Sequence, residues 1–218
     1  SRRLVLFDID GTLLLARGVS AFVEAGKHVF GEDFSIEGLP LGGQLDPSIL
    51  YAALERLGME PHEVNLQAFR SPYATFLERV FASGDRVAET LPGVTELVEA
   101  LVGCEDIDLG LLTGNIEETG RMKVAAAGLD LTHFTVHAWG DEGALREHLP
   151  HVALERWRTQ RRILRDFEHA IIIGDTVHDV HCGKVNGCRV LAVCTGSGHR
   201  AELEAAGADR VVEDLTQT

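Results

Sequence analysis

The feature of the sequence that most constrains the fold is an apolar run, residues 4–7, followed by two aspartates and a glycine. The run is short, lacks polar alternation and stops at Gly11, which is typical of a strand buried on both faces of a parallel sheet. Alternation at the strand end points Asp8 and Asp10 the same way. Two like charges at the edge of a core repel each other and lose hydration, so we expect a compensating group.

A divalent cation is the simplest compensating group, because hard cations such as Mg²⁺ prefer carboxylate oxygens. Aspartate and glycine are also common in the turns that end strands, so the pair by itself fits an ordinary turn at least as well. The positions of the other acidic residues in the chain distinguish a cation site from an ordinary turn.

Composition narrows the class of protein. The 218 residues include 20 Lys and Arg against 34 Asp and Glu, a formal net charge of −14, which disfavours binding to nucleic-acid backbones and to anionic membranes. A small anionic partner stays compatible, since a metal ion and one local cation can reverse the field inside a pocket. No CxxC pair, membrane-length apolar stretch or signal-peptide pattern is present, so we expect a cytosolic protein; the oligomeric state stays open.

The periodicity of apolar residues divides the chain into two regions. Residues 16–87 show helical periods and no convincing strand, and the expected helices cover 19–30, 46–57 and 61–82. Asp46 before Pro47 is typical of an N-cap followed by proline in the first helical position, and Pro72 should disturb the third helix.

The rest of the chain, residues 1–15 and 88–218, alternates strands and helices. Strands are expected at 107–112, 134–137, 170–173, 189–193 and 210–212, with helices between them, one of which covers 154–165. Such alternation predicts the α/β class, with a parallel sheet covered by helices on both faces. The all-helical region 16–87 is then an insert in this core.

Polar residues collect at the ends of three expected strands. Asp8 and Asp10 end the first, residues 113–115 (Thr-Gly-Asn) end the strand at 107–112, and Asp175 with Asp179 follow the strand at 170–173. Ligands of open α/β sheets bind outside the carboxyl ends of the strands, near the point where strand order reverses, so we expect these residues to share one crevice. Asp175 alone fits a helix cap equally well, but together the acids form an oxygen-rich cation site.

These motifs, in this order, resemble those of the haloacid dehalogenase (HAD) superfamily, in its phosphatase branch with a small helical cap (phosphoglycolate phosphatase-like). The segments that carry the resemblance are Asp8-Ile-Asp-Gly-Thr-Leu-Leu, Leu112-Thr-Gly-Asn and Gly174-Asp with Asp179. The resemblance covers essentially the whole chain. It implies a Rossmann-like core of residues 1–15 and 88–218, a helical cap of residues 16–87, Mg²⁺ dependence, and hydrolysis of a phosphoryl group through an aspartyl-phosphate.

Residue chemistry agrees with the roles that the resemblance implies. Asp8 attacks phosphorus in line, while Asp10 protonates the leaving oxygen and later takes a proton from the hydrolytic water. Mg²⁺ is held by Asp8, Asp175 and the backbone carbonyl of Asp10. Asp179 orders a Mg²⁺-bound water or a lysine.

Several residues are candidates for binding the substrate. The phosphoryl oxygens are expected at a helix start, on Thr113 and the backbone of Gly114 and Asn115. The resemblance also implies a phosphate-binding lysine, which many relatives place in a Lys-Pro segment before the last motif, but this chain has no such segment between residues 138 and 170. Lys123 is then the expected lysine, on the helix that begins at the Thr113 loop, as in relatives that carry a helical lysine after Thr-Gly-Asn. Arg121, Arg161 and Arg162 are its substitutes, and an ordinary solvated helix lysine is the alternative. In the cap, Gln44 is expected to contact the substrate.

Asp10 favours phosphate esters over halides, because a halide leaves without protonation and the dehalogenases of this superfamily lack an acid at that position. The expected function is therefore that of a cytosolic Mg²⁺-dependent phosphatase acting on a small phosphorylated metabolite, phosphoglycolate-like or a sugar phosphate. The alternatives are a phosphomutase of the β-phosphoglucomutase type on the same core, and a non-catalytic phosphate-binding protein.

Overall fold

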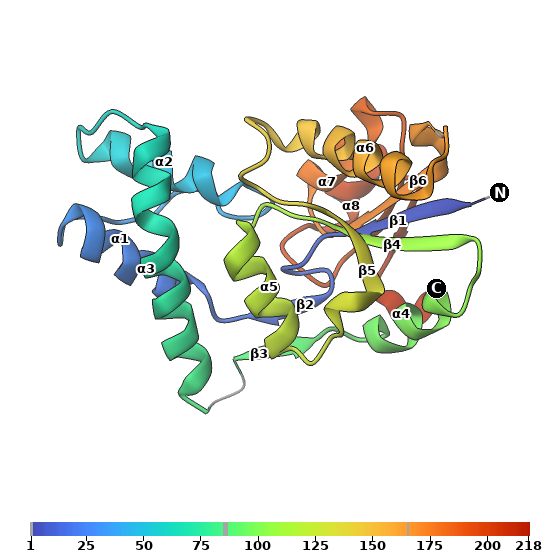
Figure 1. Ribbon diagram of the computed structural model, residues 1–218, viewed down its shortest axis with the longest axis horizontal. Coiled ribbons are helices and arrows are strands. Elements are labelled where there is room, and N and C mark those ends of the chain that lie inside the picture. Colours follow the sequence, from blue (N-terminus) through green and yellow to red (C-terminus); the bar gives the residue numbers. More distant parts are fainter. Residues whose placement is uncertain (1, 85–86, 165) are drawn as a thin grey trace.

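Six parallel strands form the central sheet of the computed structural model, which describes residues 2–84, 87–164 and 166–218 (Figure 1). The strands are β1 (Arg3–Phe7), β4 (Ile107–Leu112), β5 (Phe134–Ala138), β6 (Ala170–Gly174), β7 (Arg189–Val193) and β8 (Arg210–Val212). Their order in the sheet is β5-β4-β1-β6-β7-β8, and every neighbouring pair is parallel. The predicted Rossmann-like α/β core is confirmed.

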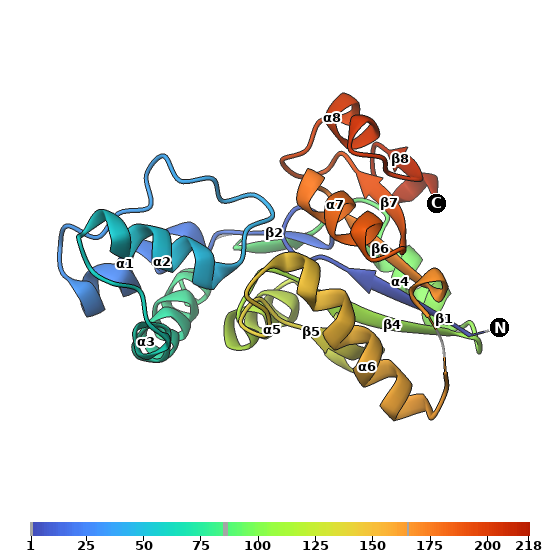
Figure 2. The ribbon, with the colours of Figure 1, turned by 90° about the horizontal axis from the view of Figure 1, so that it is seen from above.

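Helices cover both faces of this sheet (Figure 2). They are α4 (Val94–Val102), α5 (Glu117–Ala126), α6 (Leu149–Arg161), α7 (Val177–Val185) and α8 (Arg200–Ala205). Val5 and Phe7 of β1 pack in an apolar cluster with side chains of α4 and α5, whereas Leu4 and Leu6 pack with side chains of α6 and α7. Every position of β1 from Leu4 on is therefore buried, which explains why its sequence is apolar without alternation.

Three further helices pack together beside the sheet, at one end of the molecule (Figures 1 and 2). They are α1 (Val19–Phe30), α2 (Asp46–Arg56) and α3 (Glu63–Ala82). Their own apolar cluster is rich in aromatic rings: Phe22 lies 4.7 Å from Phe69 and 5.1 Å from Tyr73, centroid to centroid. Pro72 lies within α3, which continues through it because both neighbouring turns are anchored in this cluster. The disturbance expected at Pro72 does not interrupt the helix, which runs from Glu63 to Ala82.

A short antiparallel ladder, which the sequence pattern did not predict, lies where the chain passes between the two regions. It pairs β2 (Leu14–Ala16) with β3 (Ala88–Thr90). Strands of three residues are too short to leave a periodic signal. The division of the chain at 15/16 and 87/88 stays a prediction, and Asp85 and Arg86 lie outside the described residues.

One core helix departs from its expected bounds. α6 begins at Leu149, five residues before the expected start, because Pro150 is favourable in the first turn of a helix. It ends at Arg161, and the expected end at Arg165 lies outside the described residues. Among the helices described, none combines the length and the apolar character needed to cross a bilayer.

Gly26 is a test of the packing inside the helical region. A Cβ at this position of α1 would lie 2.0 Å from the ring of the buried Phe34, so Gly26→Ala should overpack the cluster by about 1–3 kcal/mol, more than the helix propensity of alanine recovers. We expect thermal unfolding several degrees below wild type. Gly103→Ala is the control, because the nearest atom there lies 3.4 Å away. Equal shifts in the two variants would contradict the packing argument.

Candidate active site

A cavity of about 580 Å³ opens between the carboxyl ends of the central strands and the helices α1–α3. The polar residues that line it include Asp8, Asp10, Gln44, Asp46, Thr113, Gly114, Asn115, Lys123, Arg146 and Asp175. Strand β1 lies between β4 and β6 in the sheet, which is where the strand order reverses. The structure thus brings the polar ends of three strands into one crevice at the switch point of the sheet.

Three carboxylates form the floor of this site. Asp8, Asp175 and Asp179 are 5%, 2% and 0% exposed, and one oxygen from each lies within 4.8 Å of the others. The Thr12 hydroxyl (3.2 Å) and the Ser197 amide (2.8 Å) donate to Asp175. Each acid is therefore held in place, and their hard oxygen donors fit a cation such as Mg²⁺.

The backbone around Asp175 requires glycine. Gly11 has a φ of +80°, which a side chain would strain, and a Cβ there would lie 2.7 Å from the Asp175 carboxylate. A Cβ at Gly196 would lie 1.9 Å from the same carboxylate. These two glycines allow the loops after β1 and β7 to close around the acid.

Asp179 is also held by hydrogen bonds within its own helix. It is the third residue of α7 and forms a capping box with Thr176, whose amide (3.0 Å) and hydroxyl (2.7 Å) donate to the Asp179 carboxylate. The helix-capping interpretation therefore applies to Asp179, while Asp175 precedes the cap. Capping positions Asp179 with an oxygen facing the other two acids.

Arg146 is the functional residue that the sequence reasoning missed. Its Nη2 lies 3.2 Å from Asp8 and 2.5 Å from Asp179, and its Nη1 donates to the Gly43 carbonyl at 3.0 Å. It sits in a 3₁₀ turn (Arg146–His148) within a polar stretch that shows no strand or helix periodicity. A single arginine among acids before α6 was the available signal, but only the fold shows that it reaches β1.

The arginines considered as substitutes for Lys123 lie elsewhere. Arg161 pairs with Asp108, and Arg121 pairs with Glu117 at 2.8 Å and lies over the Trp139 ring. Arg162 occupies the left-handed end of α6. None of the three lines the cavity.

Lys123 is buried, so its interpretation as a solvated helix lysine is wrong. It is 6% exposed, and its Nζ donates to Asp10 Oδ2 (2.8 Å) and to Asn115 Oδ1 (2.6 Å). The Asn115 amide nitrogen in turn donates to Asp10 (2.8 Å) and to the Thr113 hydroxyl (2.9 Å). Burial lowers the pKa of Lys123, but its neighbours Asp10, Tyr73 and Asp46 together outweigh burial, Asp10 most of all, and the net pKa lies above its usual value.

Asp46 does not cap its own helix, and that prediction is wrong. The N-cap of α2 is Leu45, and the Asp46 carboxylate instead accepts from the Ile116 amide, 3.1 Å away, just before α5. The Asp46 amide also donates to the Gly114 carbonyl at 2.7 Å. The side chain therefore satisfies the amino end of a core helix, and tertiary contact overrides the local signal.

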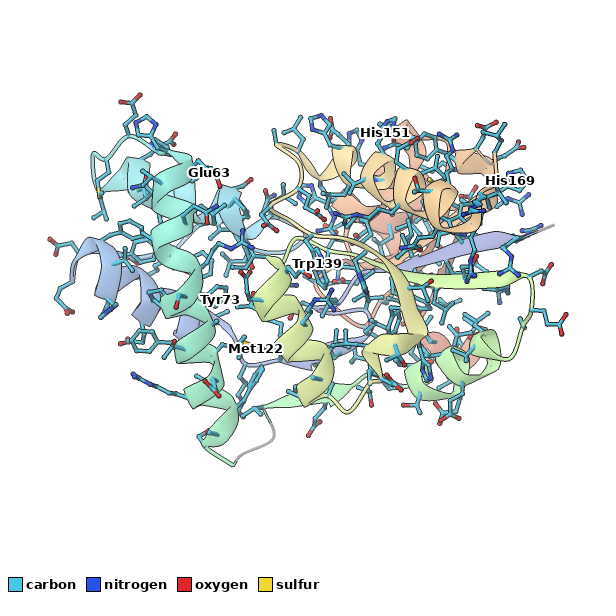
Figure 3. The ribbon with its side chains drawn as sticks, viewed as in Figure 1. Glu63, Tyr73, Met122, Trp139, His151 and His169 are labelled. Atoms are coloured by element: carbon cyan, nitrogen blue, oxygen red, sulfur yellow. The ribbon has the colours of Figure 1, made fainter. Side chains whose placement is uncertain are left out.

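The loop that precedes α2 lies against the core. Gln44, which lines the cavity, has its Nε2 3.1 Å from Nε2 of His178 on α7. A Cβ at Gly114 would lie 2.0 Å from the Gln44 carbonyl oxygen, so the two backbones meet too closely for any side chain there. Figure 3 labels Tyr73 on α3 and Met122 on α5, two residues of the apolar contact between the helical region and the core.

The acidic floor is electrostatically strained without a cation. Burial raises the pKa of the Asp8 carboxyl well above its usual range, Arg146 opposes this shift, and the neighbouring acids add to it. Burial and the Asp179 carboxylate raise the pKa of Asp175 to about 6. Ionised, the three carboxylates and the Arg146 guanidinium leave two negative charges uncompensated within this cluster, which one divalent cation balances.

Asp175→Asn tests this electrostatic account in the metal-free protein. A carboxyl whose pKa is raised in the folded state stabilises it below the unfolded pKa, and that contribution is lost as the pH rises through about 6. In EDTA at pH 7.5, we expect Asp175→Asn to be more stable than wild type by up to about 2 kcal/mol, and the gain to shrink at pH 4.5.

Thermal unfolding at the two pH values measures the effect. Asp209→Asn is the matched control: hydrogen bonds to this acid outweigh its burial and hold its pKa below the usual value, so the same substitution should destabilise the protein at pH 7.5. Metal-free Asp175→Asn that unfolds below wild type at pH 7.5 would contradict the account.

Comparison with known proteins places the chain in a family. A family model described as haloacid dehalogenase-like hydrolase matches residues 5–184. The probable phosphatase IndB of Dickeya dadantii is 27% identical, over 98% of this chain and 90% of that protein, and the pyrophosphatase PpaX of Oceanobacillus iheyensis is 23% identical, over 99% and 94%. The structure of CbbY from Rhodobacter sphaeroides in complex with phosphate superposes with a TM-score of 0.73 at 21% identity, over 100% of this chain and 96% of that one. The chain belongs to the haloacid dehalogenase-like hydrolase family, and it is a hydrolase.

Proposed function

We propose that this hydrolase is a Mg²⁺-dependent phosphatase, which cleaves the phosphate monoester of a small molecule through an aspartyl-phosphate on Asp8. The observation that carries the proposal is the floor of the cavity, where three buried carboxylates and Arg146 lie beside Asp10. The two relatives, named as a probable phosphatase and a pyrophosphatase, and the phosphate complex of CbbY support phosphoryl hydrolysis.

The donor set supports Mg²⁺ as the cofactor. Asp8, Asp175 and the backbone carbonyl of Asp10 would hold the ion, and Asp179 would order the water around it. All of these donors are oxygens, which is what a hard cation requires. When bound, Mg²⁺ neutralises the charge of the phosphoryl oxygens and so lowers their repulsion with the attacking carboxylate.

The proposed chemistry takes place in two displacements. A carboxylate oxygen of Asp8 attacks phosphorus, the bond from phosphorus to the alcohol oxygen breaks, and Asp10 gives its proton to the departing oxygen. Water then attacks the phosphorus of the aspartyl-phosphate, Asp10 takes a proton from it, and inorganic phosphate leaves with Asp8 restored. Lys123 and Asn115 both donate to one oxygen of Asp10, and this orients the acid.

The loop at residues 113–116 offers one amide to the phosphoryl group. The amides of Thr113, Asn115 and Ile116 already donate to protein oxygens. Within this described loop, the Gly114 amide is therefore the backbone donor that could bind a phosphoryl oxygen. The Thr113 hydroxyl lies beside it. Lys123 and Arg146 supply positive charge on the two sides of the site, and Gln44 lies on its cap side.

Asp8→Asn tests the nucleophile. Wild-type protein with Mg²⁺ should release inorganic phosphate from an aryl phosphate; EDTA should stop the reaction, and excess Mg²⁺ should restore it. Asp8→Asn should lower turnover by at least about 10³-fold, because the amide cannot form the aspartyl-phosphate, which is an acyl phosphate. Acid-quenched wild type should carry a phosphoryl group that Asp8→Asn lacks, measured by intact-protein mass.

The same assay separates the alternatives. A phosphomutase would convert a sugar phosphate to its isomer without releasing phosphate, which product analysis of glucose 1-phosphate detects. A non-catalytic binding protein would show neither reaction across a broad panel of phosphate esters.

Lys123→Ala tests the buried lysine. Removal of its charge leaves Asp10 without its cation and the phosphoryl group with one partner fewer, so we expect kcat/KM to fall by about 10²-fold or more. Lys184→Ala is the matched control, since Lys184 pairs with Asp209 on the surface at 3.0 Å, and it should keep wild-type kinetics. Retained turnover in Lys123→Ala would remove this lysine from the site.

A further inference from the structure

The two ends of the cavity differ in chemistry. Every charged residue of the floor comes from the core. The other end is formed by β2 and by the helical region that follows it, which we call the cap. This end is lined mainly by apolar side chains, namely Leu15, Val19, Phe22, Ile36, Leu41 and Ile49. Phe22 and Ile36 are buried, and Val19 lies at the rim with 57% of its surface exposed. The part of a substrate that extends away from the phosphoryl group therefore meets an apolar wall.

The described residues of the cap contribute a negative charge to the cavity lining but no positive charge. Among the described residues of the helical region, Asp46 is the charged side chain that lines the cavity. The basic residues described in that region, Arg17, Lys27, Arg56, Arg70 and Arg79, do not line it. The nearest cation is Lys123 of the core, whose Nζ would lie 3.6 Å from a Cβ at Gly18. A second anionic group on the substrate would therefore meet the Asp46 carboxylate and, as its nearest cation, this one lysine.

The two cations of the cavity are already engaged. Lys123 is bonded to Asp10 and Asn115, and Arg146 is bonded to Asp8 and Asp179. Moving Arg146 to a distal anion would uncover two buried carboxylates, and an unpaired buried charge is costly. Moving Lys123 would break its hydrogen bonds to Asp10 and to the buried Asn115, so a substrate carboxylate at the cap end would have to compete with both for this lysine.

The volume of the cavity also favours a leaving group larger than two carbons. A volume of about 580 Å³ lies within the range of about 300–1,000 Å³ that is usual for small-molecule sites. A two-carbon leaving group would fill only a small part of this volume. Tyr73, buried on α3, lines the cavity and adds a hydroxyl beside the apolar side chains.

From this juxtaposition we infer that the alcohol released by the enzyme is uncharged and largely apolar, of the size of a substituted aromatic ring, and that esters with a second anionic group are poor substrates. The inference rests on the proposed phosphatase function and narrows its substrate class. It separates this chain from enzymes whose leaving group is a carboxylate such as glycolate, or a second phosphate.

A pair of substrates that differ in one group tests the inference. We expect kcat/KM for 4-methylbenzyl phosphate to exceed that for 4-carboxybenzyl phosphate by at least about tenfold, because the carboxylate enters a largely apolar end beside Asp46, where the nearest cation, Lys123, is already bonded to Asp10 and Asn115. Ethyl phosphate should also be at least about tenfold worse than the methylbenzyl ester, since it leaves the apolar wall unfilled. Phosphate release with Mg²⁺ measures all three.

Val19→Lys places a positive charge at the cap end of the cavity, at a rim position that tolerates a polar side chain. The new cation should narrow the ratio between the two benzyl esters by about threefold or more, as expected for a partly exposed ion pair. Val64→Lys is the matched control, on the exposed side of α3 and away from the cavity, and it should leave the ratio unchanged.

The outcomes separate this inference from the function on which it rests. Equal or faster hydrolysis of the carboxybenzyl ester, or a ratio that Val19→Lys does not move, overturns the apolar-alcohol inference while the phosphatase stands. Absence of phosphate release from all three esters, in wild type with Mg²⁺, overturns both.

Discussion

The mutual repulsion of three buried carboxylates is the constraint on which the rest of the structure depends. Asp8 comes from the start of the chain and Asp175 and Asp179 from the junction of β6 and α7, and no folded chain gathers such charges without compensation. Arg146 supplies part of it, and hydrogen bonds from the loops supply more. The remaining negative charge is what the proposed divalent cation would balance.

The helical region contributes to the site by contact as well as by enclosure. Gly43 accepts from Arg146, Asp46 accepts from the Ile116 amide at the start of α5, and Gln44 meets His178. The loop before α2 therefore touches both the acidic floor and the loop proposed to hold phosphate. These few bonds connect the helical region to both parts of the proposed site, and the apolar residues behind them line the rest of the cavity.

Much of this was predictable because the signals are local. A parallel strand buried on both faces is apolar at every position, as residues 4–7 are, and strand ends at a switch point share one crevice. The residues that escaped prediction act over long distances. Arg146 lies in a stretch without periodicity, and Asp46 carries a strong N-cap signal that it satisfies on another helix. For both residues, the partner lies far away in the sequence and cannot be recognised from the neighbouring residues.

The sequence by itself determined the α/β alternation, the helical insert and the family to which the chain belongs, because hydrophobic periodicity and short motifs record local geometry and chemistry directly. Only the tertiary structure decided that Lys123 is buried against Asp10, that Arg146 bridges Asp8 and Asp179, and that side chains of α1 and α2 line one end of the cavity with mainly apolar groups. Burial and pairing depend on which surfaces meet, and in this protein they are brought together from segments more than a hundred residues apart.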